Sequence, residues 1–226
     1  MILKRGSLML VLGLLSLSSL LHASTVLRAR AINLLTQEPI NSAAYLNGDH
    51  LRVECGDKTS ANVVLYQRNG QLWLLTPDAP STSDHSQVSS PAVVIEPVLF
   101  VKKGGGVPIE GRRCNFYTGF RDDKKVIDIW TVDRKQLNLE ADEFTLLQAL
   151  QKFGSGELAP AGDIFLAGSR DWEQNSGYSG VPVRMIRYND DGLALQTITL
   201  ANAEPVETST DIFELPSGFH GQARFK

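Results

Sequence analysis

The sequence predicts a mainly β protein of the α+β class, built as a single curved antiparallel sheet with helices against one face. Most apolar segments are short and are separated by turn pairs such as Asn47-Gly48 and Asn69-Gly70, which favour hairpins. Only residues 140–153 carry apolar side chains at helical spacing. Strands that return on themselves, with a helix between them, indicate helices packed on an antiparallel sheet.

The N-terminus has the pattern of a secretory signal peptide. Lys4 and Arg5 precede a leucine-rich stretch over 8–21, and the small residues Ala23 and Ser24 follow at a plausible cleavage site. The alternative is an uncleaved N-terminal anchor, but the apolar stretch is short and interrupted by serines. The expected division is a signal peptide over 1–24 and one domain over 25–226, exported to the periplasm, with no transmembrane segment in the mature chain.

Charge and length narrow the class of partner. The full chain has 226 residues and a formal net charge of −3, and removal of two leader cations makes it more acidic. A mildly acidic protein has no general attraction to nucleic acid or anionic lipid. The remaining chain is long enough for one domain with one core.

The first half of the chain predicts a strand over 25–35 and two hairpins. The hairpin over 42–55 ends in a strand that alternates apolar and polar residues, so one face is buried and the other is wet. The hairpin formed by 62–67 and 72–75 is apolar on both faces. Such strands are covered on both sides, by helices or by a ligand.

The next stretch has few regular signals. The segment from Pro77 to Pro91 is rich in Ser, Asp and Pro and is expected to be an exposed loop or mobile flap. Pro97 interrupts the apolar run over 93–101 and argues against a central strand. Residues 102–106, KKGGG, are expected to be a flexible connection.

Regular structure returns after residue 111. Strands over 112–120 and 126–132 flank a charged turn, and a helix follows over 140–153, where Gly154 is a suitable stop. The segment 156–180 is irregular, and its only strong apolar cluster lies at 164–166. This segment is expected to hold a short helix or a loop packed over the sheet.

A hairpin over 181–200 turns at residues 189–192, NDDG, and its return strand changes apolar phase, which suggests a bulge or apolar neighbours on both faces.

The closing segment carries a family resemblance. It matches the pattern D-x-x-F-E-[LIV]-P-x-G-[FY] at Asp211, Phe213, Glu214, Leu215, Pro216, Gly218 and Phe219. This ending resembles that of the LolA-like envelope proteins, the superfamily of the periplasmic lipoprotein carrier, which includes uncharacterised relatives. The resemblance extends more weakly back to about Tyr45. It implies a half-barrel sheet and a role in binding lipids or acyl chains, in sensing, or as a scaffold.

The sequence offers little chemistry. Residues 177–180, GYSG, lack the last glycine of a nucleophile elbow, and no Gly-Lys-Ser/Thr follows the glycines at 104–106. No histidine has zinc-ligand spacing to a second ligand, and the paired aspartates lie in turns. We therefore predict no catalytic residue, no metal site and no cofactor. Cys55 and Cys114 either form a disulfide, worth about 4 kcal/mol in the chain-entropy model, or are two buried thiols.

A surplus of apolar residues predicts a binding site. One face of the sheet packs against helices, and the sequence supplies only one strong helix to cover the other. The candidate lining residues of an apolar pocket are Trp73, Leu74, Phe116, Ile129, Trp130, Ile186 and Ile198. The alternative is that the segments 93–101 and 164–166 fill this space as core. A register change of one residue would turn each side chain to the opposite face.

Two functions follow as expectations. The first is a periplasmic, non-enzymatic protein that binds a lipid, a lipoprotein acyl chain or another apolar ligand in a half-barrel pocket, in lipoprotein or envelope biogenesis. The second is an envelope scaffold, interaction or sensor protein that binds another protein through a sheet edge or the flap from Pro77 to Pro91. Apolar sheet residues accessible in a cavity would favour the first function.

Overall fold

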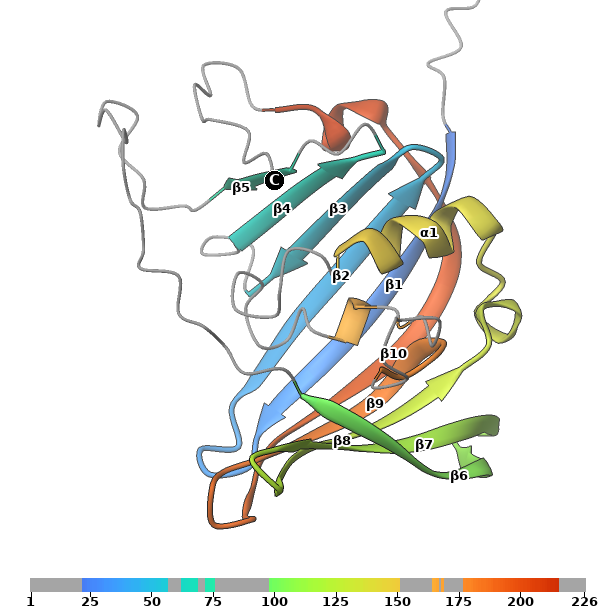
Figure 1. Ribbon diagram of the computed structural model, residues 1–226. Coiled ribbons are helices and arrows are strands. Elements are labelled where there is room, and N and C mark those ends of the chain that lie inside the picture. Colours follow the sequence, from blue (N-terminus) through green and yellow to red (C-terminus); the bar gives the residue numbers. More distant parts are fainter. Residues whose placement is uncertain are drawn as a thin grey trace, which may run out of the picture.

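The computed structural model describes residues 22–56, 62–68, 72–75, 98–150, 164–166, 168 and 177–215. These residues form one antiparallel sheet of ten strands in the order β5-β4-β3-β2-β1-β10-β9-β8-β7-β6 (Figure 1). The strands are β1 (His22–Asn33), β2 (Pro39–Asn47), β3 (His50–Cys55), β4 (Asn62–Gln67), β5 (Leu72–Leu75), β6 (Leu99–Ile109), β7 (Arg112–Arg121), β8 (Lys124–Val132), β9 (Val181–Tyr188) and β10 (Ala194–Thr208). The helical elements are η1 (Arg134–Leu137), α1 (Ala141–Leu150) and η4 (Thr210–Phe213). The predicted mainly β, antiparallel architecture is confirmed.

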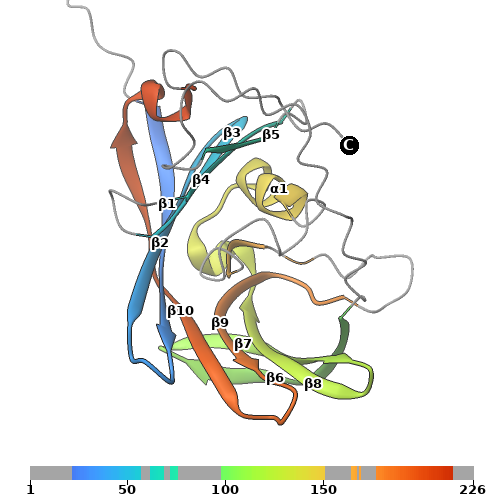
Figure 2. The same ribbon diagram turned by 90° about the vertical axis from the view of Figure 1, so that its left-hand side faces the viewer.

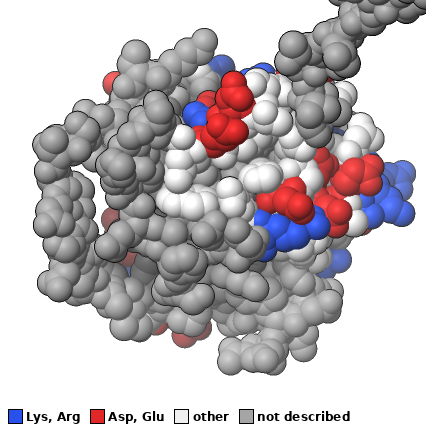
Figure 3. Space-filling view, turned by 90° about the horizontal axis from the view of Figure 1, so that it is seen from above, with Lys and Arg blue, Asp and Glu red and all other residues white. Residues whose placement is uncertain are grey.

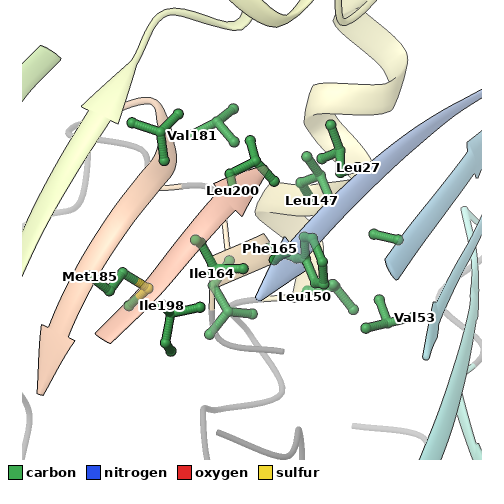
Figure 4. Close-up of a cluster of buried hydrophobic side chains, with 14 of the residues drawn as sticks. Leu27, Val53, Leu147, Leu150, Ile164, Phe165, Val181, Met185, Ile198 and Leu200 are labelled. Atoms are coloured by element: carbon green, nitrogen blue, oxygen red, sulfur yellow. The ribbon is translucent and has the colours of Figure 1, made fainter. Parts of the chain in front are cut away.

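The sheet curves around α1, which lies on its concave side (Figure 2). Leu146, Leu147 and Leu150 of α1 are at most 1% exposed, and Ile164 and Phe165 are fully buried beside them. Apolar side chains from β1, β3, β9 and β10 converge on this cluster (Figure 4). Full burial of a large apolar side chain stabilises a fold by about 1.5–3 kcal/mol, so this concave core dominates the stability of the sheet.

Local contacts explain where α1 begins. The carboxylate of Glu143 accepts a hydrogen bond from the backbone N–H of Glu140 at 2.9 Å, which satisfies a donor that the helix itself leaves open. Asp142 and Glu143 place negative charge in the first turn, where the helix dipole favours it. The predicted helix end at residue 153 lies outside the described residues.

The predicted hairpin turn at residues 189–192 is also confirmed, whereas the predicted turn Asn69-Gly70 lies outside the described residues. Asn189 accepts hydrogen bonds from the backbone of Asp191 and Leu193, and Gly192 adopts a φ of +79° that favours glycine. The pairing of β10 with β9 shifts between Ala194 and Gln196. This bulge accounts for the change of apolar phase in the return strand.

One expectation about a chain break was wrong. Residues 102–106, expected to be flexible, lie inside β6, where the register against β7 shifts twice between Lys102 and Val107. The glycines allow a bulged strand because backbone pairing requires no side chain. Pro39 is the first residue of β2, a position that proline tolerates.

The N-terminal strand overlaps the predicted signal peptide. β1 begins at His22, and Ser24 is 2% exposed with its hydroxyl hydrogen-bonded to that of Thr208. Residues 1–21 and the flap from Pro77 to Pro91 lie outside the described residues, so both expectations stay predictions. In the part of the chain that is described, no helix is long and apolar enough to cross a membrane.

The described part of the closing segment, residues 211–215, packs on the convex face. Arg52 of β3 donates a hydrogen bond from Nη1 to the carbonyl of Ile212 at 2.7 Å. Phe213 is 7% exposed, and its ring centroid lies 5.9 Å from that of His50. η4 therefore covers the convex side of β3, whereas α1 covers the concave side.

Charges are mixed on the surface at this end of the molecule. Seen from above, acidic and basic side chains of the described residues lie next to each other and form no field of one sign (Figure 3). Arg68 illustrates this arrangement, because it forms ion pairs with Asp49 at 2.9 Å and Asp142 at 3.3 Å. The described part of this face has no broad electrostatic attraction for a polyanion.

Candidate interaction surface on the convex face

The structure does not bring the predicted pocket residues together. Tyr117, Ile129, Met185 and Ile198 are neighbours in one row across β7, β8, β9 and β10, on the concave face. The adjacent row, one residue along each strand, contains Phe116, Trp130 and Arg184 on the convex face. The alternation of side chains along a strand separates these rows.

The other predicted residues divide in the same way. Ile186 pairs with Asp128 and Thr197 and lies on the convex face beside Trp130. Trp73 pairs with Leu65 on the convex face of the opposite half of the sheet. Leu74 pairs with Val64, and its side chain is outside the described part.

The concave face is filled by the protein's own side chains. Ile129 is 1% exposed and Ile198 is fully buried. Figure 4 shows Ile164 and Phe165 in the space between Ile198 and the β1 and β3 side of the sheet. Residues 164–166 thus occupy the region in which the sequence predicted either a ligand or core.

The convex row forms a stack of aromatic and cationic groups. The rings of Phe116 and Trp130 are 4.7 Å apart at an interplanar angle of 18°, and the guanidinium of Arg184 lies 5.6 Å from the Trp130 ring centroid. All three side chains are partly exposed. Gly104 is the β6 neighbour of Phe116, and open space lies where its Cβ would be, so this residue places no side chain over the stack.

We name the surface around this stack the convex patch. It consists of Arg30, Phe116, Trp130, Arg184, Ile186, Thr197 and Thr199, which the register places side by side across β1, β7, β8, β9 and β10.

Hydrogen-bonding capacity in the convex patch is incompletely used. Nε of Arg184 and Oγ1 of Thr197 are buried atoms that have no hydrogen-bond partner among the described residues. No ion pair joins Arg184 or Arg30 to a carboxylate in the same described ranges, whereas the neighbouring Arg28 pairs with Glu204 at 3.2 Å. The patch therefore combines apolar area with unneutralised positive charge.

A polar network borders the convex patch. The buried carboxylate of Asp128 accepts hydrogen bonds from Thr118 at 2.8 Å and Tyr188 at 2.8 Å and forms an ion pair with Lys125 at 2.6 Å. Burial, then the hydrogen bond to Asp128, raises the pKa of Tyr188. Burial acts to lower the pKa of Lys125, but its contacts with Asp128 and Tyr188 outweigh burial and raise it.

These protonation states give the network a structural role. At neutral pH, Lys125 stays charged and Tyr188 stays a neutral phenol, because both pKa values move away from neutrality. General acid–base catalysis favours a group whose pKa lies near the working pH, and neither side chain meets that condition. The network fixes the relative positions of β7, β8 and β9, and hence of the convex stack.

The two cysteines are separate buried thiols. Cys55 in β3 and Cys114 in β7 are both free, and β2, β1, β10, β9 and β8 lie between their strands in the sheet. Burial, with a smaller contribution from Glu54, raises the pKa of Cys55 to about 12, and burial also raises the pKa of Cys114. Of the two alternatives from the sequence, the structure shows the buried thiols and not the disulfide.

The sequence analysis missed the two arginines of the convex patch. It weighed only apolar side chains as site candidates, although the strand phase already places Arg184 on the same face as Ile186. Arg30 lies across Thr199 from Arg184, and only the pairing of β1 with β10 shows that proximity. No cluster of His, Cys, Asp or Glu within the described ranges is placed to hold a metal ion.

Comparison with known proteins gives fold-level likeness only. No family model and no curated protein matches the chain. An uncharacterised conserved protein from Thermus thermophilus superposes with a TM-score of 0.44 and 10% identity, over 88% of each chain. MucB in the MucA/MucB complex of Pseudomonas aeruginosa has a TM-score of 0.40 and 10% identity, and the match covers 88% of this chain but 57% of MucB. PNGF-II has a TM-score of 0.44 and 10% identity, over 88% of this chain and 30% of its own. With TM-scores below 0.5, these superpositions support no argument about what this chain does.

Proposed function

We propose that this protein is a non-enzymatic envelope protein that binds another polypeptide through the convex patch. The observation that supports this proposal is the stack of Phe116, Trp130 and Arg184 on the face opposite α1. Tryptophan and arginine are enriched among the residues that contribute most to protein–protein affinity, and apolar contact beside unneutralised charge is typical of such sites. The signal-peptide pattern in residues 1–24 supports a periplasmic location.

The filled concavity argues against the acyl-chain function. A ligand there would have to expel buried side chains such as Ile164 and Phe165, each worth about 1.5–3 kcal/mol, together with their neighbours. A twelve-carbon chain gains about 10 kcal/mol at about 0.8 kcal/mol per buried methylene, before the cost of ordering the ligand. Displacing three such side chains would cost about 5–9 kcal/mol and remove most of that gain.

The β6 edge of the sheet is also a poor binding site. β6 presents Lys102 and Lys103 to solvent and is bulged twice at its glycines, and natural edge strands use both features to prevent pairing with other strands. The convex patch therefore replaces the edge as the proposed protein-binding surface. The open curved sheet with a helix in its concavity fits the LolA-like half-barrel, which we retain as the proposed architecture.

Site-specific photo-crosslinking in the host's own periplasm tests the proposal. Phe116 is replaced by a benzoylphenylalanine, and Glu207, which is exposed on β10 and outside the patch, receives the same residue as a control. We expect a discrete protein adduct at position 116 that weakens when Arg184→Ala is added, and no matching adduct at position 207. Absence of a position-specific adduct overturns the proposal. A lipid of defined mass that co-purifies with the wild-type protein would instead support the acyl-chain function.

A further inference from the structure

We propose that the polypeptide bound at the convex patch presents a carboxylate side chain to Arg184, next to a large apolar side chain that contacts Trp130 and Ile186. This inference rests on the proposed function and names the chemistry of the partner. It follows from which polar groups of the convex patch have hydrogen-bond or ion-pair partners among the described residues and which do not.

The first argument is the state of the arginine. Nε of Arg184 is buried and has no hydrogen-bond partner among the described residues. Its guanidinium lies 5.6 Å from the Trp130 ring centroid. Contact with the indole ring restricts the guanidinium, and its fixed fork of N–H donors matches the two oxygens of a carboxylate.

The second argument is the composition around that arginine. Thr197 lies beside Ile186 on the next strand, and its hydroxyl Oγ1 also lacks a partner within the described ranges. A hydroxyl also donates a hydrogen bond to an anion, although more weakly than a guanidinium, so both open positions suit the same ligand. The carboxylate of Asp128, which pairs with Ile186 on this face, is already engaged by Lys125, Thr118 and Tyr188, which leaves the charge of Arg184 for a partner.

The third argument is a second cation at a defined spacing. The register places Arg30 across Thr199 from Arg184, so two strand spacings of about 4.8 Å separate their backbones. Arg28, also on β1, is already neutralised by Glu204 and is not available. A partner with a second acidic residue about 10 Å from the first would engage both Arg184 and Arg30.

The stack supplies the apolar half of the site. Phe116 and Trp130 present partly exposed rings, and Gly104 leaves the space beside Phe116 open. An inorganic anion or a soluble carboxylate would leave this area in water. The combination therefore favours a segment in which Asp or Glu stands near Phe, Trp, Leu or Ile.

Selection from a display library of random twelve-residue peptides against the mature protein tests this chemistry. We expect the selected peptides to carry Asp or Glu near an aromatic or large aliphatic residue. In the best peptide, Asp→Asn should weaken binding to the wild-type protein at least tenfold, but less than twofold to the Arg184→Gln variant. Arg184→Lys should recover only part of the affinity, because an ammonium lacks the planar fork. Arg28→Gln is the matched control and should leave binding unchanged.

The outcomes separate the two proposals. Two results would overturn the carboxylate inference and leave the proposed function standing. In the first, the selected peptides no longer bind the Trp130→Ala protein, but Asp→Asn does not change their binding to the wild-type protein. In the second, the selected peptides are rich in Lys and Arg. Circular dichroism first shows that the Trp130→Ala and Arg184→Gln proteins are folded. If the peptides bind both variants as tightly as the wild-type protein, the proposed binding surface is overturned and the inference with it. Binding that inorganic phosphate competes away but that Asp→Asn leaves unchanged would point to a phosphorylated partner and also overturn the carboxylate assignment.

Discussion

Truncation of Phe165 tests directly whether the concave face is core or ligand site. Phe165 is fully buried and lies in the concavity near Leu150 of α1 (Figure 4). Removal of a buried phenyl ring loses its transfer free energy and leaves a cavity, which together cost about 3–5 kcal/mol. We expect Phe165→Ala to lower the free energy of unfolding by about 4 kcal/mol. With a urea m-value of about 2 kcal/mol/M, the midpoint would fall by about 2 M.

The assay is equilibrium urea unfolding followed by circular dichroism, with equal m-values required for the comparison. Leu35→Ala is the matched control, because Leu35 is 76% exposed and its truncation should change the free energy of unfolding by no more than about 0.5 kcal/mol. A shift for Phe165→Ala as small as that of the control would refute the reasoning. It would mean that the segment around Phe165 contributes little to the core and can leave the concavity, and the acyl-chain function would then regain its support.

Three further predictions concern stability and reactivity. Asp128→Asn should lower the free energy of unfolding by about 1–3 kcal/mol in urea titrations, because a buried acceptor shared by Tyr188 and its neighbours loses its charge; an unchanged midpoint would contradict the role assigned to the network. Cys55 should resist a thiol reagent in the folded protein and react once denaturant is added. The pKa of Cys55 rises from 9.0 to about 12 on folding, so between these values only the unfolded thiol ionises. The free energy of unfolding of the wild-type protein should therefore fall relative to that of Cys55→Ala as the pH rises above 9.0. If the two free energies change in parallel with pH, the thiol is accessible in the folded protein. Gly180→Ala should destabilise by about 1–3 kcal/mol or more, since φ is +92° and a Cβ would lie 2.5 Å from the carbonyl oxygen of Val132; a wild-type midpoint would show that the backbone relaxes there.

Local patterns predicted most of the strands. The chain reverses direction at the turn pair Asn47-Gly48 and at the NDDG turn over 189–192. The helix predicted over 140–153 contains α1. These signals are local, because turn residues and spacing act within a few positions of the chain. The glycines at 104–106 led to the wrong prediction of a flexible connection for the same reason. Their pairing with β7 uses backbone groups and therefore leaves no apolar pattern in the sequence.

The site depended on information that alternation alone does not contain. A strand that is apolar on both faces, such as β8, shows that Ile129 and Trp130 point in opposite directions but not which of them faces the helix. Packing against Phe165 and α1 determines which face of the strand is buried in the core, and both come from parts of the sequence distant from β8. The separation of Cys55 from Cys114 likewise follows from the strand order, which no spacing along the chain reveals.

The pairing of the first strand with the last has a consequence for how the molecule is made. β1 and β10 meet at the middle of the sheet and join β2–β5 to β6–β9, and Arg28 pairs there with Asn202. Strands β2 to β5 and strands β6 to β8 are built from hairpins of neighbouring residues and can form early, whereas β9 follows β8 only after a long connection and the central seam requires β10. Until β10 is available, β1 remains an unpaired edge and the two flanks are tethered only by the chain. Synthesis of β10, and any passage of that strand through a translocation pore, therefore precede completion of the sheet.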